Sequence, residues 1–248
     1  MKSALAGCLW LWITLVIVGA FLYAPSAEGF IGESSRILFF HVPMAWVSFI
    51  AFMHAGVASI LYLSKRHPRF DNSAAAAVEI GLVFCILATV TGSMWAKTMW
   101  GAFWNWDPRQ TTIVMTLVFY AAYLALRGAV QDPERRATLS AAYAILGLVI
   151  TPFFIFVLPR IGFTLHPDPV VNTEGTLKME SRMFQVLIAS GLGFTVLYFW
   201  MHNLRCRVQA LQERDEAELE PELGSMGSSM GNRHRSSDRS DEVVEARS

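Results

Sequence analysis

Six long apolar stretches, separated by short polar connections, fill most of the chain up to about residue 205. Each is mostly uncharged, is bounded by charge, Pro or Gly, and lacks the alternation of a half-buried strand. A helix needs roughly 20 apolar residues to cross a bilayer, and uninterrupted apolar runs favour helices over a membrane barrel. We therefore predict an all-α membrane protein, a bundle of six transmembrane helices at residues 5–24, 38–63, 78–96, 111–127, 137–158 and 183–202.

The first stretch has two interpretations. It starts with Lys2, runs apolar and ends in small residues, as a cleaved signal peptide does. The run is long for a signal, however, and Trp10 and Trp12 are bulky. We favour a retained helix.

Positive charges in the short connections orient the predicted spans. With the N-terminus in the cytoplasm, the cytoplasmic side holds nine Lys and Arg residues and the other side six, which favours cytoplasmic N- and C-termini. The nine are Lys2, Lys65, Arg66, Arg69, Arg127, Arg135, Arg136, Arg205 and Arg207; the six are Arg36, Lys97, Arg109, Arg160, Lys178 and Arg182.

The composition changes after the sixth stretch. Residues 1–207 form the predicted membrane domain, whereas 208–248 are rich in Ser, Gly and charge and are expected to form a mostly disordered cytoplasmic tail. The formal net charge is +0, and no basic cluster suggests nucleic acid as a partner.

Six spans place the connections 1–2, 3–4 and 5–6 on one side of the membrane, whichever side that is. The first feature on this shared face is His41, in the segment RILFFHVPMAW at the start of the second span. Pro43 suits the first turn of a helix, where its missing N–H costs nothing. Alone, His41 would be an ordinary interfacial histidine.

The second feature is the segment TMWGAFWNWDPRQTT, residues 98–112, between spans three and four. Four tryptophans lie within twelve residues, and an aromatic belt at the membrane interface is the simplest explanation. A belt does not need Gly, Asp, Pro and Arg between its tryptophans. The mixture suits a planar ligand that is apolar across its body and anionic at one edge. The residues are Trp95, Trp100, Gly101, Trp104, Trp106, Asp107, Pro108 and Arg109.

The third feature is His166, in FTLHPDP between spans five and six. With His41 it places two imidazoles on one face, and neutral imidazoles are good axial ligands for haem iron. His54 lies thirteen residues beyond His41 in the same span, about 20 Å deeper at 1.5 Å per residue. We expect His54 to form hydrogen bonds within the bundle instead, and His67 and His202 to lie near the cytoplasmic side.

These residues resemble a known family. WGAFWNWDPRQTT is similar to the tryptophan-rich (WWD-type) segment of the haem-handling membrane proteins of cytochrome c biogenesis. Six spans, the HVPMAW segment at His41 and the LHP segment at His166 resemble the haem exporter protein C (CcmC) branch. The resemblance covers residues 1 to about 205. Phe103 and Gln110 depart from the expected Trp and Leu, which leaves the contacts at those two positions open.

The resemblance implies a haem-binding protein of the bacterial inner membrane rather than an enzyme. It would hold non-covalent haem b at the periplasmic face, with His41 and His166 as axial ligands. It would pass the haem to a membrane-anchored haem chaperone, beside ABC-type exporter subunits and a small membrane subunit. The implied cradle for the ring is Trp100, Gly101, Trp104, Trp106, Asp107, Pro108 and Arg109.

Two other hypotheses compete with this one. A cytochrome c synthase (haem lyase) subunit would attach haem to apocytochrome c itself, but a chain this short lacks the extra spans and histidines expected for that task. A permease or an electron-transfer cytochrome b would carry paired histidines within its spans, where only His54 is expected to be buried.

Overall fold

The computed structural model describes the backbone of residues 2–29, 31–166 and 179–245, and within these ranges it contains helices and no strands. Six helices are long and apolar enough to cross a membrane, which confirms the six predicted spans and a multi-pass membrane protein. The principal helices are α1 (Lys2–Val18), α2 (Leu38–Lys65), α3 (Pro68–Trp100), α4 (Pro108–Ala129), α5 (Pro133–Pro152) and α6 (Ser181–Glu245). Shorter helical turns are η1 (Gly19–Tyr23), η2 (Gly32–Ile37), η3 (Phe153–Val157) and η4 (Leu158–Arg160).

Three of these helices begin at a proline, and the residue before each proline caps the helix. The side chains of His67, Asp107 and Asp132 accept hydrogen bonds from backbone N–H groups of the first turns of α3, α4 and α5. Proline fits this position because its fixed φ is helical and its missing N–H would have no partner there. The capping side chain satisfies one of the N–H groups that the first turn leaves free. The sequence therefore sets where these spans begin.

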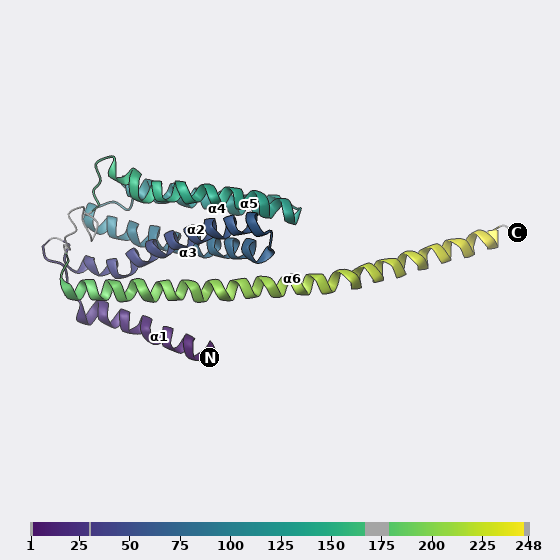
Figure 1. Cartoon of the computed structure of the whole chain (residues 1–248), viewed down its shortest axis with the longest axis horizontal. Coiled ribbons are helices and arrows are strands. Elements are labelled where there is room, and N and C mark those ends of the chain that lie inside the picture. Colours follow the sequence, from purple (N-terminus) through teal and green to yellow (C-terminus); the bar gives the residue numbers. More distant parts are fainter. Residues whose placement is uncertain (1, 30, 167–178, 246–248) are drawn as a thin grey trace. The chain divides into compact units, whose positions relative to one another are not determined.

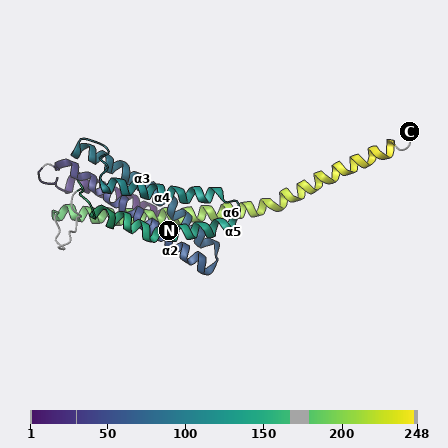
Figure 2. The same ribbon diagram turned by 90° about the horizontal axis from the view of Figure 1, so that it is seen from above.

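The connections 1–2, 3–4 and 5–6 lie at one end of the bundle, on the left in Figure 1, as the sequence predicts. The spans run along a common direction in both views (Figure 1, Figure 2). Contacts between two of these connections confirm their shared end, because Thr164 from the third donates to Asp107 from the second. The three features singled out in the sequence therefore share one face.

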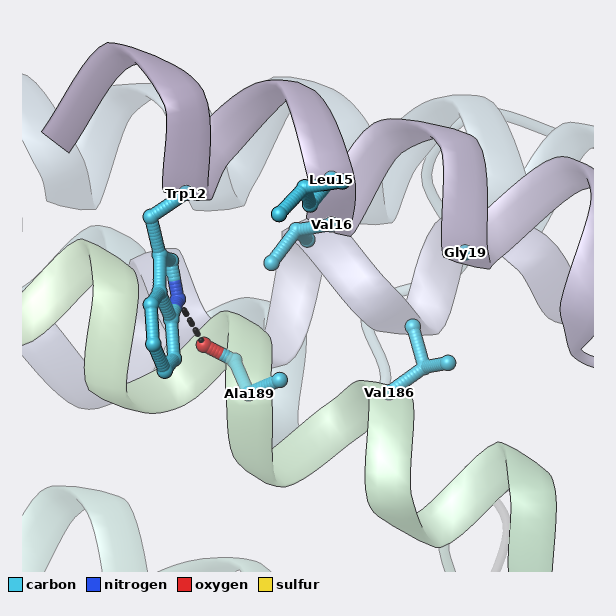
Figure 3. Close-up of a pocket in the computed structure, with 6 residues that line it drawn as sticks. All are labelled: Trp12, Leu15, Val16, Gly19, Val186 and Ala189. Atoms are coloured by element: carbon cyan, nitrogen blue, oxygen red, sulfur yellow. Dashed lines mark hydrogen bonds between the residues drawn. The ribbon is translucent and has the colours of Figure 1, made fainter. Parts of the chain in front are cut away.

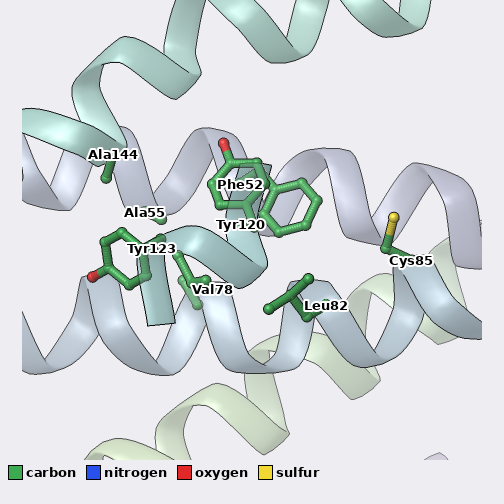
Figure 4. Packing of buried hydrophobic residues seen from close by; sticks show 9 residues of the cluster. Phe52, Ala55, Val78, Leu82, Cys85, Tyr120, Tyr123 and Ala144 are labelled. Carbon is green, nitrogen blue, oxygen red and sulfur yellow. The ribbon is translucent and has the colours of Figure 1, made fainter. Parts of the chain in front are cut away.

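The central core lies among α2, α3, α4 and α5 (Figure 4). The rings of Phe52 and Tyr120 stack with centroids 3.7 Å apart and an interplanar angle of 5°. The Tyr120 hydroxyl shares a hydrogen bond of 2.9 Å with Thr151 of α5, so its polar end is satisfied inside the bundle. A Cβ on Gly81 would lie 2.8 Å from the Phe52 ring, so this glycine allows α3 to approach α2 closely.

The first and last spans pack side by side, although they are far apart in sequence. The Trp12 indole N–H donates to the Ala189 carbonyl at 2.9 Å across a shallow apolar groove, and Val186 faces Gly19 (Figure 3). The groove is lined almost wholly by apolar side chains and offers no ligand for a metal. Its composition suits lipid tails or helix packing rather than a charged cargo.

Pro43 does not lie in the first turn of a helix, contrary to the sequence expectation. The helical turns of η2 run directly into α2, so Pro43 stands inside a continuous helical segment. Its missing N–H leaves the carbonyl of Phe39 without a donor four residues on. The buried hydroxyl of Ser190 in α6 donates to that carbonyl at 2.5 Å.

The chain divides into two compact units, residues 1–203 and 204–248. The backbone of α6 is helical as far as Glu245, through the segment for which the sequence predicts disorder. Strong helix formers dominate residues 205–220, which accounts for helix there. Farther on, Gly and Ser are frequent and no apolar stripe continues, so such a helix has no face to pack. The organisation into a haem-handling domain, 1–207, and a disordered tail, 208–248, stays a prediction.

Candidate functional site

His41 lies in the first turn of α2 and contacts α3. Its Nδ1 is 3.1 Å from the hydroxyl of Thr91. That hydroxyl has one proton, which it donates to the carbonyls of Leu87 and Ala88 at 2.8 and 3.1 Å. When Nδ1 donates to this hydroxyl, Nε2 carries the lone pair, which is the tautomer that a metal ligand requires. A hydrogen bond to the other ring nitrogen is how proteins orient an imidazole that ligates a metal.

Gly92 provides the space in which the His41 ring lies. A Cβ at Gly92 would be 2.8 Å from Cε1 and 3.4 Å from Nδ1 of His41. Real Cβ atoms do not approach other heavy atoms at 2.8 Å, so any side chain here would displace the ring. Thr91 and Gly92 together fix the position of His41, and neither is recognisable in the sequence as part of a site.

His166 lies close to the same place. Its ring centroid is 5.9 Å from that of Trp95 in α3, at an angle of 45°. Trp95 is one helical turn beyond Thr91, the partner of His41. The imidazoles of His41 and His166 are near enough for their charges to interact. The structure therefore brings together the two histidines that the sequence singles out, from connections more than 100 residues apart.

Asp107 joins the tryptophan-rich segment to the segment that carries His166. Its carboxylate is 4% exposed and accepts from the backbone N–H of Arg109 at 2.9 Å, as the cap of α4. It also accepts from the Thr164 hydroxyl at 2.8 and 3.1 Å and from the Leu165 N–H at 2.7 Å. The carboxylate therefore holds together the start of α4 and the backbone just before His166. Pro108 follows as the first residue of α4.

The three tryptophans of the predicted cradle, together with Trp95, form two nearly perpendicular pairs. Trp95 and Trp100 meet edge to face with centroids 5.2 Å apart, and Trp104 and Trp106 do so at 5.8 Å. Between the pairs, Gly101 ends α3 with φ +78°, a conformation that glycine adopts without strain. The two pairs offer several flat apolar surfaces within one short segment.

Trp106 is presented outward. It is 76% exposed and its backbone has φ +56°, which is uncommon for a residue other than glycine. Such strain persists where surrounding contacts impose it, and it is frequent at functional sites. The carboxylate of the neighbouring Asp107 is held by three donors, which restricts the backbone on this side of Trp106.

The two departures from the family pattern have roles within the loop. Gln110 accepts from the Asn105 N–H at 2.9 Å, and its amide donates to the Phe103 carbonyl at 3.1 Å. The ammonium group of Lys97 lies 5.7 Å from the centre of the Phe103 ring and donates to the Gly101 carbonyl at 2.8 Å. The side chains of Gln110 and Lys97 therefore form hydrogen bonds to the loop backbone from its two ends.

The residues at this end of the bundle fit a flat ligand with an anionic edge. Two imidazoles lie at this end, and the Trp95 ring is beside that of His166. The Asn105 side-chain nitrogen is buried and has no acceptor among the described residues, which leaves a donor for a ligand carboxylate. Arg109 lies at the start of α4, next to Asp107, and adds a permanent cation to the same segment.

The other buried histidines form a separate cluster with α3. Nδ1 of His54 is 2.7 Å from the Tyr198 hydroxyl, and Nε2 is 3.3 Å from the Ser73 hydroxyl. Nε2 of His202 lies 3.2 Å from the same hydroxyl and 3.0 Å from the Ser73 carbonyl. His54 thus forms hydrogen bonds within the bundle, as predicted, and His202 is a partner that the sequence did not indicate.

The imidazoles of this cluster contact groups of the bundle itself. The ring centroids of His54 and His202 are 4.5 Å apart, and both rings lie against the Ser73 hydroxyl. The pair at the outer end, which the sequence singles out, stays the candidate for a haem.

Comparison with known proteins identifies the family of the chain. The family model described as "Heme exporter protein C" matches residues 1–220. A protein named heme exporter protein C from Bradyrhizobium diazoefficiens is 31% identical over 239 residues, covering 93% of this chain and 89% of the relative. The Escherichia coli protein of the same name is 34% identical over 198 residues, 80% of this chain and 76% of the relative. A ccmC-like mitochondrial protein of cytochrome c biosynthesis from Marchantia polymorpha is 32% identical over 197 residues, covering 79% and 83%.

Proposed function

The chain belongs to the haem exporter protein C family, whose members handle haem in cytochrome c maturation, and we propose that it holds haem b non-covalently between His41 and His166. One observation carries the proposal: imidazoles from two distant segments lie near each other at one end of the bundle, that of His41 against the Thr91 hydroxyl and that of His166 beside Trp95. Two neutral imidazoles supply the axial ligands of a six-coordinate iron.

The tryptophan-rich segment would contact the porphyrin around these ligands. Trp100, Trp104 and Trp106 offer aromatic faces and edges, each worth roughly 1 kcal/mol beyond area burial. Asn105 and Arg109 would pair with the haem propionates, since a fixed guanidinium fork matches a carboxylate. Gly101 shapes the start of the loop, while Asp107 and Pro108 shape its end and the first turn of α4.

Delivery is the second half of the proposal. The exposed ring of Trp106 lies on the side that an acceptor must approach, and it would present haem to a membrane-anchored haem chaperone. The protein would work in the inner membrane with ABC-type exporter subunits and a small membrane subunit, as a carrier and not an enzyme. The positive charges of the inner connections support cytoplasmic termini and a periplasmic site.

An optical spectrum of the purified protein tests the ligand assignment. We expect a low-spin spectrum, oxidised and reduced, from which His41→Ala and His166→Ala each depart. If both variants bind haem with an unchanged low-spin spectrum, the two histidines are not the ligands. Adding a CxxCH peptide separates the carrier from the synthase, because a synthase would attach the haem covalently.

A further inference from the structure

Thr164 stands between the buried carboxylate of Asp107 and the backbone of His166. Its hydroxyl donates to Oδ2 of Asp107 at 2.8 Å and approaches Oδ1 at 3.1 Å. The same oxygen accepts from the backbone N–H of His166 at 3.1 Å. One hydroxyl therefore relays a hydrogen bond from a fixed carboxylate to the residue that carries the imidazole.

The carboxylate is a rigid anchor for this relay. Asp107 caps α4 through the Arg109 N–H, is almost fully buried, and also accepts from the Leu165 N–H at 2.7 Å. Hydrogen bonds to a charged acceptor are stronger than neutral ones. The three residues from Thr164 to His166 are therefore tied to the first turn of α4.

Packing does little to hold the same segment. The preceding side chains Ile161 and Phe163 are 71% and 85% exposed, and Leu165 is 44% exposed. A Cβ on Gly162 would meet no atom within 4 Å. Apolar burial is slight in these residues, and the hydrogen bonds of Asp107 and Thr164 tie the backbone that carries His166 to the start of α4.

We infer that Thr164 is a positioning residue for the haem ligand His166, acting through its hydroxyl and not by contact with the haem. The inference rests on the proposed function, in which His166 ligates the iron. A ligand must be held within about 0.5 Å of its productive position, and supporting hydrogen bonds are how proteins achieve this. Loss of the Thr164 hydroxyl should therefore detach His166 from the iron while His41 still holds it.

The test compares Thr164→Val, which keeps the shape and removes the hydroxyl, with Thr164→Ser, which keeps the hydroxyl. Each protein is purified full-length, and haem content is measured with optical and electron paramagnetic resonance spectra. Thr164→Val should move part of the iron from low spin to high spin and weaken haem retention roughly two- to tenfold, the equivalent of one hydrogen bond. Thr164→Ser should match the wild type. Added imidazole should restore the low-spin spectrum of Thr164→Val.

Two further variants, one at a control threonine and one at the ligand itself, separate the possible outcomes. Thr14→Val makes the same change at an exposed threonine of α1 whose hydroxyl donates to the Trp10 carbonyl of its own helix, and it should leave the spectrum unaltered. His166→Ala tests the ligand itself. A changed His166→Ala spectrum with a wild-type Thr164→Val spectrum would overturn the positioning role alone. An unchanged His166→Ala spectrum would overturn the ligand assignment and the positioning role with it.

Discussion

Ser190 of α6 donates a hydrogen bond to the backbone carbonyl of Phe39 in α2, with 2.5 Å between the two oxygens. The carbonyl lacks its helical donor because the residue four positions on is Pro43. Ser190→Ala should leave this buried acceptor unpaired and lower stability by about 1 kcal/mol. Thermal unfolding in detergent measures the loss.

Ser59→Ala is the matched control for that substitution. The Ser59 hydroxyl is equally buried but has no hydrogen-bond partner among the described residues. Its removal should be neutral or stabilising. Equal losses in the two variants would show that the bond between α6 and α2 contributes nothing specific.

Gly92→Ala should disturb the haem site while the protein still folds. Alanine favours helix over glycine by about 1 kcal/mol, but the new methyl group would lie 2.8 Å from Cε1 of His41. Displacing the ring should weaken ligation by about 1–3 kcal/mol, the usual cost of overpacking. Haem content and the low-spin fraction report the effect. Gly191→Ala, where nothing lies within 4 Å of the new atom, should behave as the wild type.

Ser73→Ala should separate the inner histidine cluster from haem binding. The Ser73 hydroxyl bridges His54 and His202, so its loss should cost about 1 kcal/mol of stability. The spectrum of bound haem should not change, because His54 lies about 20 Å along α2 from His41. A spectral change of the size seen for His166→Ala would contradict the assignment of haem to the outer end alone.

The orientation of the bundle is open to direct measurement. Reporter fusions at residues 30, 105 and 170 should report the periplasm, and fusions at 68, 132 and 215 the cytoplasm. If a fusion at residue 105 reports the cytoplasm, the candidate site lies on the cytoplasmic side and the periplasmic assignment is wrong.

Trp106 should matter more for delivery than for retention of haem. Its ring is 76% exposed, so Trp106→Ala removes little buried surface but deletes an outward aromatic face. Haem appearing on the chaperone should fall, while haem that co-purifies with the protein stays close to the wild-type amount. Trp104→Ala, in the partner ring of the pair, is the companion variant. If both variants transfer haem at the wild-type rate, the segment is an aromatic belt at the membrane interface and not a surface for haem delivery.

The positions of the six spans could be predicted from the sequence because local features mark their ends. Pro68, Pro108 and Pro133 start helices, and the apolar run after each is long enough to cross a bilayer. The shared face of His41 and His166 follows from counting spans, which requires no knowledge of packing.

The supports of the candidate site could not be predicted in this way. Thr91 and Gly92 act on His41 because packing brings α3 against α2, and Thr164 acts because the fold brings Asp107 to it from 57 residues away. Pro43 is a similar case, because the carbonyl that it leaves without a helical donor is satisfied by the hydroxyl of a serine about 150 residues away. Motifs along the chain indicate the proposed ligands, but the contacts that orient these side chains depend on the folded bundle.

The pairing of the first span with the last has a consequence for synthesis. Until α6 enters the membrane, the Trp12 indole has no Ala189 carbonyl to bond, and the carbonyl of Phe39 has no Ser190 hydroxyl. A nascent chain halted before that point would lack the bond that supports the helical turn of His41, so under the proposed function the haem site is complete only after the last span is inserted.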